Sequence, residues 1–108
     1  MQNKIIAKKL LNEFLKLKLI LIKERESNWI RGVLAIIEKL ELALSDHCNE
    51  SVDYCKDACD TWKAMYKGNG SFSDYYIWHD DFEQRVKLNK PLDSIKETIC
   101  EIIEDNGL

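Results

Sequence analysis

The chain has little of what most other fold classes require. Its 108 residues include one proline and four glycines, too few turn-forming residues for a sandwich of many short strands. Its most apolar stretch is interrupted by Lys16 and Lys18 and is too short to cross a bilayer. No small-residue cleavage site of a secretory signal follows the basic N-terminal residues. We therefore expect a cytoplasmic protein that does not enter the membrane.

An excess of basic residues is also missing, and the net charge is −3. Residues 1–31 carry eight basic and three acidic side chains, whereas residues 32–108 carry eight basic and sixteen acidic ones. This distribution argues against a nucleic-acid partner, which requires a basic footprint. An acidic surface suits a basic protein partner, such as a nuclease domain. It is equally typical of a plain solvated face.

What the chain does have is helical periodicity. Apolar residues recur every three or four positions over residues 4–23, 29–44, 52–66 and 91–105. Phe82 and Val86 indicate a short further helix, with Pro91 opening the last one. The sequence therefore predicts an all-α fold, a single small bundle of four to five helices over residues 1–108.

Two local features refine this prediction. Ser27 or Asn28 is placed to cap the second helix. Gly32 lies inside that helix, where glycine costs about 1 kcal/mol relative to alanine. A close approach of another helix is one reason to keep a glycine there.

Cysteines and histidines are few, and their spacing is that of core residues more than of ligands. Cys55 and Cys59 share one helical face, and a metal there would need His47, Cys48 or His79 as well. The C-x-x-C spacing of zinc modules is absent, and free cysteine is commonly buried. We expect reduced cysteines, with no metal and no cofactor.

Catalytic signatures are also absent. His79-Asp80 resembles the metal-binding pair of some phosphohydrolases, but those need further ligands on other helices. Ser71 and Ser73 lack both the G-x-S-x-G elbow and the lysine of a phosphate-binding loop. We expect a protein that is not an enzyme. A metal-dependent hydrolase using His79, Asp80 and the cysteines remains the third alternative.

Residues 68–78 are the one segment that does not read as plain helix. The glycines favour a sharp turn, and the Ser71 and Asp74 side chains are expected to bond loop amides. We favour a structured loop or a short extended segment. The Ser71-x-x-Asp74 pattern opening a helical turn is the alternative. Alternation would place Tyr75 and Ile77 on one face, opposite Tyr76 and Trp78.

This segment resembles the G-x-G-S-F-[S/N]-D signature of a family of small bacterial proteins. The matching positions are Gly68, Gly70, Ser71, Phe72 and Asp74, with Trp29 as the early tryptophan of the preceding helices. The chain departs from the family in carrying Tyr-Tyr-Ile-Trp after the aspartate, where aliphatic residues are common. Some members resemble immunity proteins of polymorphic toxin systems, including contact-dependent growth inhibition.

The resemblance implies a protein that neutralises a cognate toxin C-terminal domain, most plausibly a nuclease, by covering its active site or substrate groove. The alternative is a small helical adaptor or self-associating module; the oligomeric state is left open. The residues expected to bind the toxin form two patches, one in the loop and one on the third helix: Asp74, Tyr76, Trp78, His79, Asp80 and Asp81, and Asp53, Asp57 and Asp60. Gly68, Gly70, Ser71 and Phe72 are expected to shape the loop.

Overall fold

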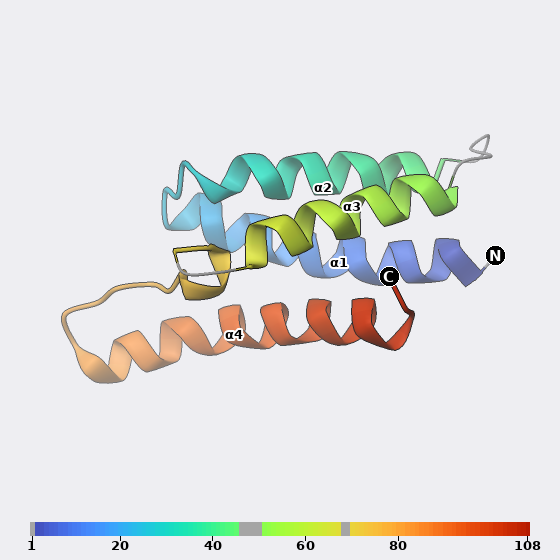
Figure 1. Ribbon diagram of the computed structural model, residues 1–108. Coiled ribbons are helices and arrows are strands. Elements are labelled where there is room, and N and C mark those ends of the chain that lie inside the picture. Colours follow the sequence, from blue (N-terminus) through green and yellow to red (C-terminus); the bar gives the residue numbers. More distant parts are fainter. Residues whose placement is uncertain (1, 46–50, 68–69) are drawn as a thin grey trace.

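The computed structural model describes residues 2–45, 51–67 and 70–108, and within them it contains helices and no strands (Figure 1). The all-α prediction is confirmed. The elements in chain order are α1 (Gln2–Lys23), α2 (Trp29–Ala43), α3 (Ser51–Tyr66), a 3-10 turn η1 (Phe72–Asp74) and α4 (Phe82–Asp105).

Helix α1 packs against the other three α-helices, and α2 and α3 also pack against each other. One side of α1 is fully buried along its length, at Ala7, Leu10, Phe14, Leu17 and Leu21. These residues follow the spacing of three and four expected for a helix that buries one stripe. The remaining core comes from one face each of α2, α3 and the second half of α4, together with Phe72 and Ile77.

The predicted apolar stripes of α2 and α3 were wrong at one position each. The apolar periods over residues 29–44 and 52–66 include Leu34 and Val52 and so predict that both are buried, but 43% and 53% of their surfaces are exposed. Ile36 and Ala58 are buried instead. The physical reason is that α2 contacts both α1 and α3, and α3 contacts both α1 and α2. The buried side of each helix is therefore set by two neighbours and not by the apolar pattern alone.

The connection between α1 and α2 is closed by backbone bonds and one carboxylate. Arg25 has a positive φ of 55°, and the Glu26 N–H donates to the Leu21 carbonyl at 2.9 Å, as in a Schellman motif. The Glu26 carboxylate then accepts from the N–H groups of Asn28, Trp29 and Ile30 at 2.9, 2.8 and 2.8 Å. Asn28 occupies the cap position, but its side chain makes no capping bond. Glu26 therefore caps the start of α2, the role that was predicted for Ser27 or Asn28.

Helix α4 is continuous, so the predicted break before Pro91 was wrong. Pro91 lies inside the helix, although it has no N–H for the i−4 carbonyl. All the buried residues of α4 lie after it, at Leu92, Ile95, Lys96, Ile99 and Ile103. The part before it projects past the end of the other helices (Figure 1). Pro91 thus marks the change from an exposed to a packed half of one helix.

The close approach expected at Gly32 is present. A Cβ at this position would lie 2.5 Å from the Met65 sulfur on α3. The missing side chain therefore lets α2 and α3 meet.

Candidate functional site

The Gly-rich segment folds into the end of the bundle around Phe72, which is fully buried. The Phe72 ring makes edge-to-face contacts with Trp29 and Trp62, at centroid distances of 5.8 and 5.7 Å, and stacks on Tyr75 at 5.5 Å. Such aromatic contacts stabilise a core beyond simple burial. Trp29 and Phe72, which both match the family signature, are therefore in contact in this fold.

Polar groups within the loop bond one another, as the sequence predicted. Gly70 has a φ of 74°, and its N–H donates to Asp74 Oδ2 at 2.7 Å. The Ser73 N–H donates to Ser71 Oγ at 3.3 Å. The loop forms the 3-10 turn η1, so the Ser-x-x-Asp alternative describes residues 71–74 better than a strand does. Gly68 lies outside the described residues.

The chain after η1 is extended and is held on α4 by two side chains that sequence reasoning missed. Asn89 accepts from the Ile77 N–H at 2.7 Å and donates to the Ile77 carbonyl at 2.8 Å. Its amide therefore pairs with one residue of the segment as a neighbouring strand would. The buried Lys96 ammonium donates to the Tyr75 carbonyl and lies 5.0 Å from the centre of the Phe72 ring.

No local signal could have identified these two residues. Asn89 and Lys96 are polar residues in a helical stretch, and each acts on a segment at least a dozen positions earlier in the chain. Their role follows only from the way α4 packs beside the loop. Burial lowers the pKa of Lys96, and the charges of Asp93 and Asp74 oppose that shift.

The predicted alternation along residues 75–78 is confirmed. Ile77 is buried and Tyr75 is half-buried, whereas 56% of Tyr76 and 62% of Trp78 are exposed. Hydrogen bonds from the side chains of Asn89 and Lys96 to the backbone thus hold one face of the segment against α4, while the other face points into solvent.

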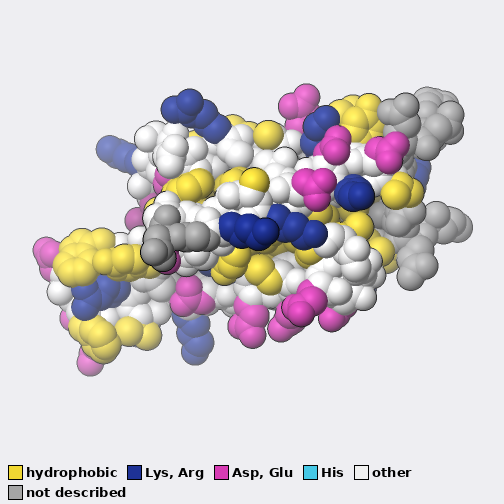
Figure 2. Space-filling view, viewed as in Figure 1, with side chains coloured by type: hydrophobic (Ala, Val, Ile, Leu, Met, Phe, Trp, Pro, Cys, Tyr) yellow, Lys and Arg dark blue, Asp and Glu magenta, His cyan; other side chains and the backbone are white. Residues whose placement is uncertain are grey.

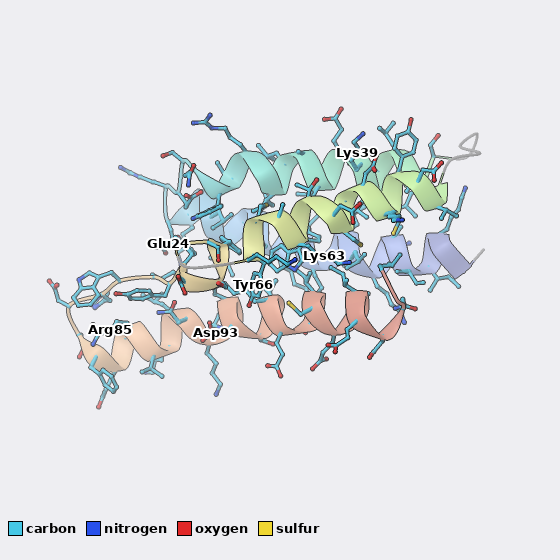
Figure 3. All side chains as sticks on the ribbon, in the orientation of Figure 1. Glu24, Lys39, Lys63, Tyr66, Arg85 and Asp93 are labelled. Carbon is cyan, nitrogen blue, oxygen red and sulfur yellow. The ribbon has the colours of Figure 1, made fainter. Side chains whose placement is uncertain are left out.

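The exposed residues continue onto the projecting half of α4. Phe82 and Val86 are 66% and 52% exposed, and the Arg85 guanidinium lies 4.4 Å from the Trp78 ring centre and 5.4 Å from that of Phe82. We call Tyr76, Trp78, Phe82, Arg85 and Val86 the aromatic tip. Figure 2 shows apolar side chains gathered around basic ones at this end of the molecule, and Figure 3 labels Arg85 there.

Acidic residues border the aromatic tip. His79, Asp80 and Asp81 are all exposed. Trp78 donates from its indole N–H to Asp80 at 3.3 Å, and the Asp81 N–H donates to His79 Nδ1 at 3.0 Å. Of the loop patch predicted from sequence, the structure therefore gathers Tyr76, Trp78 and residues 79–81 around one end of the molecule. Asp74 is exposed but is engaged by the Gly70 amide.

The second predicted patch is separate from the first. Asp53, Asp57 and Asp60 are exposed on α3, and Lys39 lies 3.8 Å from the Asp57 carboxylate. Figure 1 places the start of α3 and residues 75–81 at opposite ends of a molecule 49 Å long. The two predicted patches therefore do not form one surface.

The cysteines on α3 pack in the core. Cys55 and Cys59 are both buried; their hydrogen bond raises the pKa of Cys59, with help from burial, and lowers that of Cys55. No group of three or more His, Cys, Asp or Glu side chains in the described parts of the chain is arranged to hold a metal ion. His47 and Cys48, named as candidate ligands, lie outside those parts.

No helix among the described residues has the length and hydropathy needed to span a bilayer. A scan against protein-family models, a search of curated proteins and a search of solved structures each found no match to the chain.

Proposed function

We propose that this chain is an immunity protein that binds and neutralises a cognate bacterial toxin domain through the aromatic tip, without enzymatic activity of its own. One observation carries the choice of surface: large aromatic side chains are held exposed by buried contacts immediately behind them. The resemblance of residues 68–77 to the immunity-like family supports a toxin as the partner.

The tip has the chemistry of an interface centre. Tryptophan, tyrosine and arginine are the residues most enriched at positions that dominate binding energy. Here Trp78 is already ordered by Arg85 on its face and Asp80 on its indole N–H. A side chain ordered before binding loses less conformational entropy when a partner covers it. Exposed aromatics held in this way favour a slow dissociation rate.

The acidic border suits a basic partner. Asp80, Asp81 and Glu83 are exposed around the tip, and complementary charge speeds association and selects against wrong partners. A nuclease domain is basic where it grips phosphates, so the tip would cover its active site or its substrate groove. The Arg85 guanidinium between two rings adds a donor for an acidic or carbonyl group of the partner.

The test is a binding measurement against the product of the adjacent upstream gene, with protection of toxin-exposed cells as a second readout. Trp78→Ala is expected to weaken the complex by at least about 30-fold, the effect of losing about 2 kcal/mol at an interface centre. Val52→Ala truncates a smaller exposed apolar side chain on α3 and serves as the control. Loss of affinity in the control alone would place the interface elsewhere.

The α3 patch gives a second control for the same experiment. Reversing the charge of Asp53 and Asp60 together tests the acidic face of α3. We expect protection to survive this change and to fail in a protein with Asp80 and Asp81 reversed. The opposite result would transfer the proposed interface to α3.

A second candidate function, self-association or an adaptor role, is favoured by the outer face of α1. Ile5, Leu15, Leu19 and Ile22 are 57%, 38%, 67% and 53% exposed, on the side opposite the buried stripe. A monomer seldom leaves such a row uncovered. Lysines lie beside this row, so two copies meeting through α1 would repel at low salt. Sedimentation at rising salt tests this. A molecular mass that increases with salt would support self-association, provided that the Leu19→Glu variant keeps the mass of the monomer.

A further inference from the structure

We propose that the groove between the ends of α3 and α4 binds a single-chain apolar carboxylate, of the size of a medium-chain fatty acid. This inference does not depend on the proposed function, because the groove and the aromatic tip share no residues. The groove has a volume of about 290 Å³. That volume lies near the lower limit for small-molecule sites in proteins.

The groove is built by the way α4 ends. The Leu108 N–H donates to the Ile103 carbonyl at 3.0 Å, and the Gly107 N–H donates to the Glu104 carbonyl at 3.2 Å. Gly107 has a φ of 65°, so the chain reverses in a Schellman motif. This reversal brings Leu108 back beside Ile103, and both side chains line the groove.

The interior of the groove is apolar and aromatic. Trp62 is almost completely buried, and Tyr66 stacks on it at a centroid distance of 4.8 Å. Cys100 of α4 lines the groove together with these rings and is hydrogen-bonded to Tyr66. Burial raises the pKa of Tyr66 from its ordinary value of 10.0, with smaller effects from the charge and hydrogen bond of Cys100 and from the charge of Asp93. The charged side chains that line the groove lie at its rim and not in its interior.

The rim supplies the charge that selects a carboxylate. Lys63 and Lys67 line the groove on the α3 side, and Glu104 lines it on the α4 side. Figure 3 shows Lys63 and Tyr66 on the side of α3 that faces α4, and Figure 2 shows basic side chains lying across an apolar strip between these helices. Among the side chains that line the groove, two ammonium groups stand against one carboxylate, so the lining carries a net positive charge.

The size and shape of the groove favour a small molecule over a protein segment. A partner helix needs an apolar channel that extends along several of its turns, whereas this groove is confined to the last turns of α3 and α4. An alkyl chain with a terminal carboxylate matches both parts: the chain covers the half-buried Tyr66 and Leu108, and the carboxylate lies between Lys63 and Lys67.

Cys100 provides the readout. It is half-buried and free, while Cys55 and Cys59 are buried, so alkylation of a Cys48→Ser protein by iodoacetamide reports mainly on the groove. We expect decanoate, below its micelle concentration, to slow alkylation of Cys100 at least about fivefold at saturation. Decanol, with the same chain and no charge, is expected to bind more weakly.

The charge requirement is tested by Lys67→Glu, a change at an exposed residue. We expect it to weaken decanoate binding about three- to fivefold, the effect of one exposed ion pair, and to leave decanol binding unchanged. Lys87→Glu, which makes the same charge change on the projecting half of α4, is the matched control. Absence of protection by decanoate would overturn the proposal. Equal binding of decanoate and decanol would overturn the assignment of a carboxylate, and protection by phosphatidylglycerol vesicles but not by decanoate would point to a lipid surface instead.

Discussion

Lys96 holds the loop with a buried, charged side chain. Its ammonium donates to the Tyr75 carbonyl beside the Phe72 ring, yet burial lowers its pKa from the ordinary 10.5. Between that lowered pKa and 10.5, the unfolded chain binds more protons than the folded chain. The contribution of Lys96 to stability therefore becomes more favourable as pH rises through this window.

The prediction compares the wild type with Lys96→Met by urea unfolding from about pH 8 to 10.5. We expect the wild type to gain stability relative to the variant as pH rises. Burial raises the pKa values of Tyr66 and Tyr75, so their contributions to stability become less favourable as pH rises. Both tyrosines are present in the wild type and in the variant, so their effects largely cancel when the two proteins are compared. The exposed Lys90→Met gives the reference. A wild-type advantage that falls with pH would contradict the argument.

Gly32 and Met65 form a second test at the residue scale. Gly32→Ala is expected to stabilise α2 by up to about 1 kcal/mol through helix propensity. Its new Cβ would meet the Met65 sulfur at 2.5 Å, which must move away and offsets part of the gain. In a Met65→Ala background the gain should be larger by about 0.5 kcal/mol or more. Urea unfolding of the wild type, the two single variants and the double variant measures this coupling. Additive changes in the free energy of unfolding would show that the Met65 contact does not oppose a side chain at residue 32.

At the scale of elements, the start of α2 depends on a residue that precedes the helix. The Glu26 carboxylate accepts from three consecutive N–H groups, which otherwise lack helical partners. Glu26→Ala is expected to reduce the free energy of unfolding by about 1–2 kcal/mol. Glu26→Gln keeps one acceptor oxygen and should therefore lose less stability than Glu26→Ala, but more than the wild type. Glu38→Ala, an exposed change within α2, is the control, and thermal or urea unfolding is the measurement.

At the scale of the whole molecule, the packing divides α4 into two halves of different stability. Residues before Pro91 contribute no fully buried side chain, whereas those after it form part of the core. Regions with few buried contacts open more readily than the core. We expect amides of residues 84–90 to exchange with solvent at least about tenfold faster than those of residues 95–103. Hydrogen exchange resolved by mass spectrometry or NMR tests this, and uniform protection along α4 would contradict it.

The same arrangement places three different surfaces on separate parts of one small fold. The aromatic tip lies on the projecting end, the acidic patch lies on α3, and the groove lies between the ends of α3 and α4. Substitutions in the tip and in the groove share no partners. Their effects on the two proposed binding activities should therefore be independent.

The amino-acid sequence by itself determined the fold class, the buried stripe of α1 and the alternation of residues 75–78. These features are local, because they follow from side-chain periods of 3.6 and 2 along one segment. The bonds within the Gly-rich turn were predictable for the same reason: Ser71 and Asp74 act on amides only a few positions away.

Only the tertiary structure decided where the candidate site lies. Asn89 and Lys96 hold the loop from twelve and twenty-one positions away, and Pro91 is accommodated in a helix that the sequence predicted to break. Phe82, Arg85 and Val86 join Tyr76 and Trp78 in one surface because α4 runs beside the extended segment. The loop and α3 patches, which the sequence could not place relative to each other, are separated by helix packing. Contacts between distant segments depend on how whole helices pack, and a local pattern carries no information about that.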